Sequence, residues 1–249
     1  MRIARVSLGG RSSTAIVKGR RVHLVSGTIW KPGDETGESA PLSAVRFLPP
    51  TKPTKIVAIG VNYLDHAGER RAPSEAQPFL KAPSSLIGPG DAIELTADAT
   101  NTHMEAEVVA VISKRARDIT EDQVDDYVLG YTAGNDVSER DWQQADLQWW
   151  RAKSSDTFTA VGPWVDTSLK PEQIEVQGLI SGRVQQSSDT SLLIHSIRTC
   201  IARISRYMTL ERGDLVFTGT PGTTGRIVAG DTCEVKVGGM SLTNPVKAR

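Results

Sequence analysis

The pattern of apolar and polar positions is most informative between residues 105 and 112, where two glutamates lead into an apolar run. Alternate side chains of a strand share one face, so Glu105, Glu107 and Val109 are expected to point the same way. A face that changes from carboxylate to valine is expected to be covered. Two ionised carboxylates in a covered place repel each other unless a cation lies between them. The alternative is an exposed strand end that runs into the core.

The remaining pattern predicts mainly short strands. They are expected at residues 15–17, 22–25, 55–60, 108–112, 215–217 and 233–237, with a Gly-rich, acidic turn at 31–34. Thr120 and Gln123 fit a capping box, and the apolar positions after them predict a short helix that ends at Gly130. The clearest predicted helix carries apolar residues at intervals of 3, 4, 3 and 4, expected in the core: Ile194, Ile197, Ile201, Ile204 and Met208.

A proline-rich segment at residues 49–53 divides the chain. Prolines at this density exclude regular structure, so the segment is expected to be a linker. We therefore predict a small N-terminal β domain at residues 1–50 and a larger domain at residues 51–249. Strands outnumber helices and do not alternate with them, which predicts an α+β, β-rich fold and argues against Rossmann and TIM-barrel architectures.

Composition excludes several classes of function. The 249 residues are 39% hydrophobic, and 29 basic residues balance 29 acidic ones, so neither nucleic acid nor an anionic membrane is an expected partner. No apolar run approaches the ~18 residues that span a bilayer, and the first residues do not resemble a secretory signal. Cys200 and Cys233 form no CxxC motif, so a reduced, cytoplasmic protein is expected. The chain has no dinucleotide-binding or P-loop motif.

A second polar cluster begins at Asp136, at the end of a predicted strand. Such an Asp is as commonly a helix N-cap as a ligand. If Asp136 meets Glu105 and Glu107, three hard oxygen ligands are available. They would suit Mg²⁺, Mn²⁺ or Ca²⁺ better than zinc, with open positions left for water and substrate.

Further candidates follow at helical spacing. Arg140 and Gln143 would share a helical face with Asp136 and could meet the oxygens of a chelated substrate. Lys153 could add a positive charge, although an isolated lysine is usually a solvated surface group.

His66 and Glu69 are three residues apart, so on a helix the carboxylate could orient the imidazole as a general base towards water. The alternative is a surface pair of little consequence. His103 could support the glutamates from behind, whereas His23 and His195 are expected to be structural.

At this point the residues resemble the fumarylacetoacetate hydrolase family, from about residue 55 to 240. The motifs appear in order, each weak alone: Gly60-Val61-Asn62-Tyr63 with His66 and Glu69, Phe79-Leu80-Lys81, His103-x-Glu105-x-Glu107, Gly130-Tyr131-Thr132, Asn135-Asp136, Arg140-Asp141-x-Gln143, Lys153-x-x-Asp156, Gly162-Pro163 and Gly219-Thr220-Pro221.

The resemblance implies a mixed β-roll packed on a small N-terminal domain, usually in a homodimer. It implies a divalent metal, commonly Mg²⁺, on the carboxylates matching Glu105, Glu107 and Asp136. Substrate contacts are implied for Arg140, Gln143, Lys153 and Thr220, and a lid pair for His66 and Glu69. The additional metal carboxylate of the longer members is replaced here by an apolar residue at or near Ile59, which favours the short acylpyruvate-type branch. Met104 and Ser155 also depart from the family pattern and bear on the pocket's shape.

Three hypotheses follow from the resemblance. The first is a metal-dependent hydrolase that cleaves a C–C bond of a 2,4-diketo acid, with His66 and Glu69 activating water and pyruvate enolate leaving. The second is a decarboxylase or isomerase of oxaloacetate-like or 2-hydroxy-dienedioate substrates in aromatic catabolism. The third is a cation-stabilised binding or structural protein without turnover. Arg70, Arg71 or Arg151 could select a substrate with a distal carboxylate, unless these arginines are simply solvated.

Overall fold

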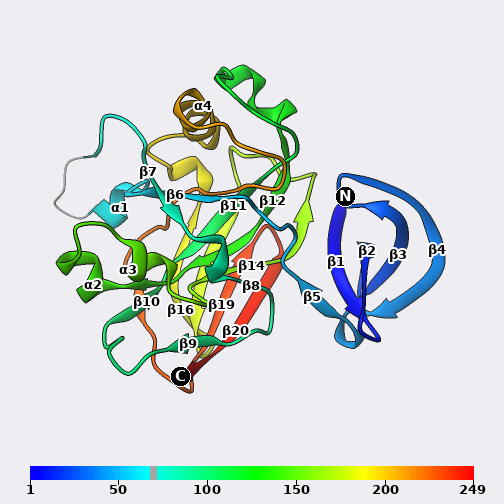
Figure 1. The fold of residues 1–249 in the computed structure, drawn as a ribbon, viewed down its shortest axis with the longest axis horizontal. Helices are drawn as coiled ribbons and strands as arrows, with labels where there is room; N and C mark the ends of the chain where they lie inside the picture. Colours follow the sequence, from blue (N-terminus) through cyan, green and yellow to red (C-terminus); the bar gives the residue numbers. More distant parts are fainter. Residues whose placement is uncertain (68–71) are drawn as a thin grey trace.

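A computed structural model describes the chain apart from residues 68–71 and the side chains of His66 and Ala67. The N-terminal strands form a lobe at one end of the molecule, and the short helices α1 to α3 lie at the other (Figure 1). The helices are α1 (Leu64–Ala67), α2 (Arg140–Ala145), α3 (Trp150–Ser154) and α4 (Ile197–Tyr207), with 3-10 turns at Leu42–Ala44, Pro83–Ser85, Glu121–Asp126 and Thr190–Leu192.

A long mixed sheet runs through both parts of the molecule. Its order is β4-β3-β2-β1-β14-β12-β11-β17-β6-β7, with β5 beside β1 and β8 beside β14. Its strands are β1 (Arg2–Leu8), β2 (Arg11–Lys18), β3 (Arg21–Thr28), β4 (Lys31–Pro41), β5 (Arg46–Leu48), β6 (Ile56–Gly60), β7 (Gln77–Lys81), β8 (Leu86–Ile87), β11 (Ala106–Ile112), β12 (Val128–Asp136), β14 (Thr159–Asp166) and β17 (Leu215–Phe217).

Two smaller sheets complete the body. One has the order β16-β15-β19-β20-β9 and the other β13-β10-β18. Their strands are β9 (Ile93–Leu95), β10 (Thr102–Met104), β13 (Ser138–Glu139), β15 (Glu175–Ile180), β16 (Arg183–Asp189), β18 (Gly225–Arg226), β19 (Thr232–Val237) and β20 (Met240–Ala248). Most strand pairs are antiparallel, whereas β6–β17, β8–β14 and β9–β20 are parallel. The β-rich, mixed fold is as the sequence predicts.

Strand β11 is buried along its whole length, and the face that changes from carboxylate to valine is covered, as predicted. Val108 and Ala110 belong to the larger core cluster, and Val109 and Val111 to a second cluster. The alternation of side chains in a strand therefore assigns each face to a different part of the core.

The N-terminal lobe is joined to the body through the sheet itself. Strand β1 pairs with β14, with Arg2 opposite Asp166 and Ile3 opposite Val165. The Arg2 Nε atom also lies 3.1 Å from Asp166 Oδ2. The lobe's hydrogen-bond ladder is therefore continuous with the sheet that carries the glutamates.

Several local expectations are wrong. Residues 31–34 begin the long strand β4 instead of forming a turn, and β1 carries no pattern that singled it out. The capping box at Thr120 is present, but it opens a 3-10 turn, and Gly130 belongs to β12. Tertiary pairing overrides the helical pattern there: a Cβ on Gly130 would lie 2.5 Å from the Asp166 carbonyl oxygen. The last predicted helix begins at Ile197, capped by Ser196, so Ile194 lies outside it.

Candidate active site

Three buried carboxylates converge where β11 begins and β12 ends. Antiparallel pairing sets Ala106 opposite Asn135, which brings Glu105 and Glu107 beside Asp136. One oxygen from each of the three carboxylates lies within 4.8 Å of the others. Their exposed fractions are 3%, 1% and 1%. The structure therefore brings these three residues together, a convergence that the sequence left as a condition and the family resemblance implied. Asp136 sits at a strand end, as predicted, and not on the helix of Arg140.

The surroundings of Glu107 disfavour its ionised form. Burial raises its pKa well above the usual range, and the nearby Asp136 and Glu105 raise it further. Opposing effects come from Lys153 and from the Gly219 N–H, which donates to Glu107 Oε2 at 2.6 Å. A bound cation would counteract the rise in pKa, because it would stabilise the ionised form.

Lys153 and Arg140 balance part of this negative charge. The Lys153 ammonium lies 2.7 Å from Glu105 Oε2 and 2.8 Å from Asp136 Oδ2, and its side chain is 3% exposed. Burial alone would lower the Lys153 pKa, but Asp136 and Glu105 outweigh it and the pKa is raised. Arg140 Nη2 lies 2.5 Å from Glu105 Oε1. Lys153 is thus a buried partner of the carboxylates and not a surface lysine.

A third cation at the cluster, Lys81, was given no role by the sequence argument. Its ammonium is fully buried and donates to Asp136 Oδ1 at 2.5 Å and to the Lys153 carbonyl oxygen. Burial lowers its pKa, and Asp136 acts in the opposite direction. The available signal was a lysine within an apolar strand motif, Phe79-Leu80-Lys81.

Arg140 is the centre of a second group of hydrogen-bonded polar residues. Arg140 Nη1 donates to Gln143 Oε1 and its Nη2 to Thr224 Oγ1, both at 2.8 Å. His103 joins this group through Thr224, with 2.9 Å between its Nδ1 and Thr224 Oγ1. Its expected support of the glutamates stays a prediction. The Thr220 hydroxyl donates to the Ala106 carbonyl at 2.9 Å. Sequence reasoning missed Thr224, since a threonine in a Gly/Thr/Pro loop has no distinguishing pattern.

The expected lid residues are only partly described. His66 belongs to α1, but its side chain lies outside the described part of the molecule, as do Glu69, Arg70 and Arg71. Their expected roles stay predictions. Two other expected histidines have structural surroundings: His23 Nδ1 lies 3.2 Å from Glu35 Oε2, and His195 Nε2 lies 3.0 Å from the Pro73 carbonyl oxygen.

The carboxylates form the floor of a cavity of about 640 Å³. Asp65, Gln143, Gln144, Thr220 and Thr224 line its polar parts. Its apolar wall is formed by four side chains, namely Ile59, Val61, Phe79 and Trp149.

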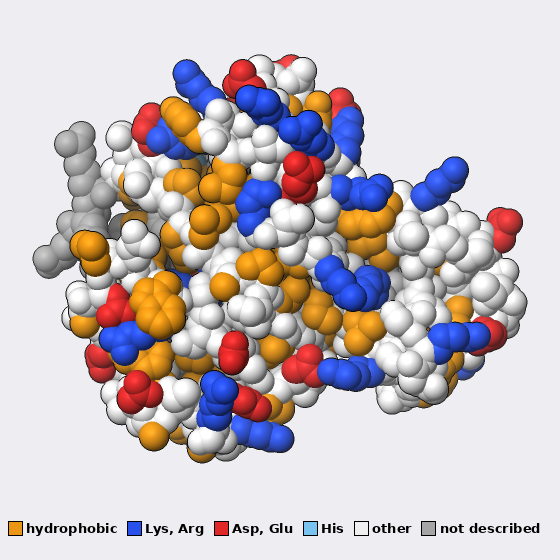
Figure 2. Space-filling view, in the orientation of Figure 1, with side chains coloured by type: hydrophobic (Ala, Val, Ile, Leu, Met, Phe, Trp, Pro, Cys, Tyr) orange, Lys and Arg blue, Asp and Glu red, His pale blue; other side chains and the backbone are white. Residues whose placement is uncertain are grey.

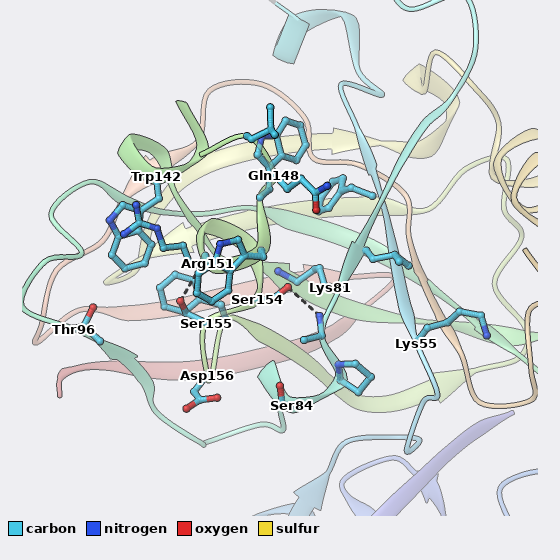
Figure 3. A pocket seen from close by; sticks show the side chains of 18 of the residues that line it. Lys55, Lys81, Ser84, Thr96, Trp142, Gln148, Arg151, Ser154, Ser155 and Asp156 are labelled. Atoms are coloured by element: carbon cyan, nitrogen blue, oxygen red, sulfur yellow. Dashed lines mark hydrogen bonds between the residues drawn. The ribbon is translucent and has the colours of Figure 1, made fainter. Parts of the chain in front are cut away.

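Figure 3 shows a larger groove of about 1210 Å³. It lies next to the cavity, because Phe79 and Trp149 line both. Arg151 lines this groove and not the cavity. Its guanidinium pairs with Asp146 at 2.7 Å and stacks on Trp142 at 4.8 Å. Hydrophobic side chains gather on the surface over this region (Figure 2).

The donor set fits a divalent cation with a preference for oxygen. Three buried carboxylates within 4.8 Å of one another are a typical ligand set for Mg²⁺ or Mn²⁺. Burial and the two neighbouring carboxylates raise the pKa of Glu107, and a cation held by the cluster would oppose both effects. A cation at this point would lie at the base of the cavity, open to a small anionic molecule.

Models of two families match the chain. The fumarylacetoacetate (FAA) hydrolase C-terminal family matches residues 55–247, and the Rv2993c-like N-terminal family matches residues 1–50. Among the helices that the structure describes, none is long and apolar enough to cross a membrane.

Curated relatives extend over most of the chain. Protein Rv2993c from Mycobacterium tuberculosis is 46% identical over 217 residues, covering 85% of this chain and 82% of that protein. The mitochondrial oxaloacetate tautomerase Fahd2a from Rattus norvegicus is 38% identical over 188 residues, covering 73% of this chain and 60% of that protein.

Solved structures share the whole fold. A 5-carboxymethyl-2-hydroxymuconate delta-isomerase from Mycobacterium smegmatis has a TM-score of 0.92 at 39% identity, with 100% of both chains covered. A maleylpyruvate hydrolase from Sphingobium sp. SYK-6, in complex with manganese(II) and pyruvate, has a TM-score of 0.83 at 26% identity, covering 100% of this chain and 99% of that one.

Proposed function

The chain belongs to the fumarylacetoacetate hydrolase family, and we propose that it is a divalent-metal-dependent hydrolase that cleaves a C–C bond of acylpyruvate-type 2,4-diketo acids. The membership makes it one of a family of enzymes that includes isomerases, hydrolases and a tautomerase. One observation carries the proposal: three buried carboxylates converge at the base of a cavity, and the cationic side chains of Lys81, Arg140 and Lys153 lie beside them.

The chemistry assigns a part to each element of the cavity. A Mg²⁺ or Mn²⁺ ion on Glu105, Glu107 and Asp136 would supply positive charge for the carboxylate and keto oxygen of a 2-keto acid. Lys153 adds a fixed positive charge beside the same oxygens. Such charge stabilises the enolate that remains when the bond to C3 breaks, without reorganisation during the reaction.

The polar network holds the substrate in place. Arg140 and Gln143 bind the substrate carboxylate, and Thr224 keeps the Arg140 guanidinium in its plane. The Thr220 hydroxyl completes the same side of the cavity. In the proposed reaction His66, oriented by Glu69, takes a proton from the water that attacks the distal carbonyl. The bond between that carbonyl carbon and C3 then breaks, the acyl group leaves as a carboxylic acid, and the enolate takes the proton at C3 to give pyruvate.

A second candidate is isomerisation, tautomerisation or decarboxylation of related 2-keto acids. The observation that favours it is the higher identity to the delta-isomerase, 39%, than to the maleylpyruvate hydrolase, 26%. All of these reactions form an enolate of a 2-keto acid. A cation held by the three carboxylates would stabilise that enolate in each case. They differ in whether water is added, a proton is moved or CO₂ is released.

A substrate panel separates the candidates. Acylpyruvates, oxaloacetate and 2-hydroxy-dienedioates are assayed with Mg²⁺, with Mn²⁺ and with chelator. Release of pyruvate without CO₂ supports the hydrolase, whereas CO₂ release or a change in dienol absorbance supports the second candidate. If no 2-keto acid is turned over with any divalent ion, the proposal is wrong.

Lys153→Met provides a direct check on the charge at the floor. We expect kcat to fall by about 10²–10³-fold, the scale of losing one electrostatic stabiliser. His66→Ala should slow hydrolysis and leave Mn²⁺ binding intact, because the imidazole does not belong to the carboxylate set. The homodimer that the resemblance implies stays a prediction, which the molar mass in solution would test.

A further inference from the structure

The charged floor of the cavity leaves little for a second substrate carboxylate to bind. Among the described residues that line the cavity, the cations are Arg140 and Lys153. Each lies within 2.8 Å of an oxygen of Glu105 or Asp136. Asp65, exposed on α1, adds a negative charge to the rim.

Two aromatic side chains, Phe79 and Trp149, line the cavity directly beside its floor. The Lys153 ammonium lies 5.1 Å from the centre of the Phe79 ring. The Trp149 ring meets Phe79 edge-on, with 5.1 Å between ring centres. Trp149 also lies over the end of β6, where a Cβ on Gly60 would be 3.7 Å from its ring. The lining of the cavity thus changes from the charged Lys153 to Phe79 and then to Trp149.

Trp149 has ring surface available for a ligand. Its exposed fraction is 36%, although Phe79 and Gly60 support it from two sides. A rigid, partly exposed aromatic ring is well suited to contact apolar groups at low entropic cost. Ile59 and Val61 extend the same apolar lining.

We propose that Phe79 and Trp149 are the subsite for the part of the substrate beyond its keto carbon, and that they select an uncharged, apolar substituent. The inference rests on the proposed function, which fixes the keto acid at the floor. The substituent then extends along the aromatic wall, away from Glu105 and Asp136. Each added methylene that reaches the wall should tighten binding about fourfold, the scale of burying one CH₂ group.

Direct binding to the Mn²⁺-loaded protein tests this proposal without turnover. Calorimetry gives the Kd of pyruvate, 2-oxobutyrate, 2-oxopentanoate and 2-oxohexanoate in turn. We expect Kd to fall about fourfold per carbon until the wall is covered. 2-Oxopentanoate should bind more tightly than 2-oxoglutarate, a probe of the same chain length that ends in a second carboxylate.

Variants test whether Trp149 causes the gain in affinity with chain length. Trp149→Ala should bind pyruvate as the unmodified protein does but lose the gain with chain length, and Trp149→Phe should keep most of it. Trp150→Ala is the matched control, because Trp150 is 69% exposed and lines the neighbouring groove but not the cavity. Thermal unfolding of each variant shows that it folds.

Contrary outcomes are distinct. If pyruvate fails to bind the Mn²⁺-loaded protein, the proposed function fails, and this inference fails with it. If pyruvate binds but the series is flat, or Trp149→Ala retains the gain, only the aromatic subsite is wrong. Tighter binding of 2-oxoglutarate than of 2-oxopentanoate would also overturn it and would favour the arginine-based selection of diacids expected from the sequence.

Discussion

Asp214 and Glu107 are both buried carboxylates, but hydrogen-bond donors surround the first and other carboxylates crowd the second. Asp214 Oδ1 accepts from the Thr54 N–H and hydroxyl and from the Lys55 N–H at 2.8–3.1 Å. Its Oδ2 accepts from the Lys55 ammonium at 2.6 Å and from the Glu211 N–H at 2.8 Å. Burial alone would raise the Asp214 pKa, yet these donors lower it.

Glu107 has the opposite surroundings. Burial, Asp136 and Glu105 all raise its pKa, and the Gly219 N–H is the backbone donor that opposes them. A buried acid with five donors stabilises the fold, whereas one that faces two other acids costs stability until a cation arrives. The comparison shows that the donors around a buried carboxylate, more than burial itself, separate a structural acid from a functional one.

The strongest test removes the charge from the functional acid. Glu107→Gln should weaken Mn²⁺ binding by more than about 10³-fold and abolish metal-dependent turnover, because one of three ionic ligands is lost. The unfolding free energy of the metal-free protein should rise, since like-charge repulsion is relieved and the amide oxygen can still accept from Gly219. Calorimetric titration and urea unfolding measure the two effects. A variant that still binds Mn²⁺ normally would refute the metal site.

The matched change at the structural acid should act on the fold alone. Asp214→Asn is expected to lower the unfolding free energy by about 3 kcal/mol, because it breaks a buried ion pair and leaves Lys55 without its anion. Urea unfolding measures the loss. Mn²⁺ affinity of the folded fraction should stay within a factor of about two, since Asp214 lies outside the cavity. A large change in that affinity would break the comparison.

The two acids should also respond to pH in opposite directions. The Glu107 pKa is raised in the folded protein, so its proton competes with the ion, and Mn²⁺ affinity should fall by up to about tenfold per pH unit as pH drops below that pKa. Stability gives a second readout. The metal-free protein should lose stability as pH rises through the Glu107 pKa, whereas Glu107→Gln, which cannot titrate at this position, should lack this loss.

Asp214 gives the other half of the pH test. Its pKa is lowered on folding, so its stabilisation is complete above the unfolded pKa of about 3.9 and is lost as pH falls through the folded value. Acid unfolding of the unmodified protein and of Asp214→Asn measures this part. Identical acid profiles for the two proteins would contradict the role of the donors.

The smallest expected effect comes from the cation beside the structural acid. Lys55→Met should cost only about 1–2 kcal/mol, because four other hydrogen bonds to Asp214 remain and the lysine side chain is 21% exposed. Thermal unfolding gives the value. A loss equal to that of Asp214→Asn would mean that the ion pair, and not the set of backbone donors, stabilises this corner.

The sequence predicted the local structure around the site residues better than the contacts between those residues. Alternation at Glu105 and Glu107 predicted the shared, covered face, since period two is a strictly local property of a strand. The convergence on Asp136 was a hypothesis, because it depends on the pairing of β11 with β12 across a loop of irregular structure and a 3-10 turn. The resemblance to a family supplied what local pattern could not.

What the sequence missed depends on long-range packing. Lys81 meets Asp136 across 55 residues, and Thr224 meets Arg140 across 84. Neither pair leaves a local pattern. The strand at Lys31–Pro41 was missed for a related reason: it is rich in polar and exposed residues, and it is a strand because β3 offers a partner.

The continuous ladder between β1 and β14 has a consequence for how this protein can be divided. A boundary near residue 50 agrees with the end of the N-terminal family match. It also separates β1 from β14, its partner in the sheet. A chain shortened to residues 51–249 would expose the backbone of Val165 and Asp166, at the end of β14, as a template for other chains. We therefore expect the shortened protein to self-associate, as light scattering would show, even with every residue of the cavity in place.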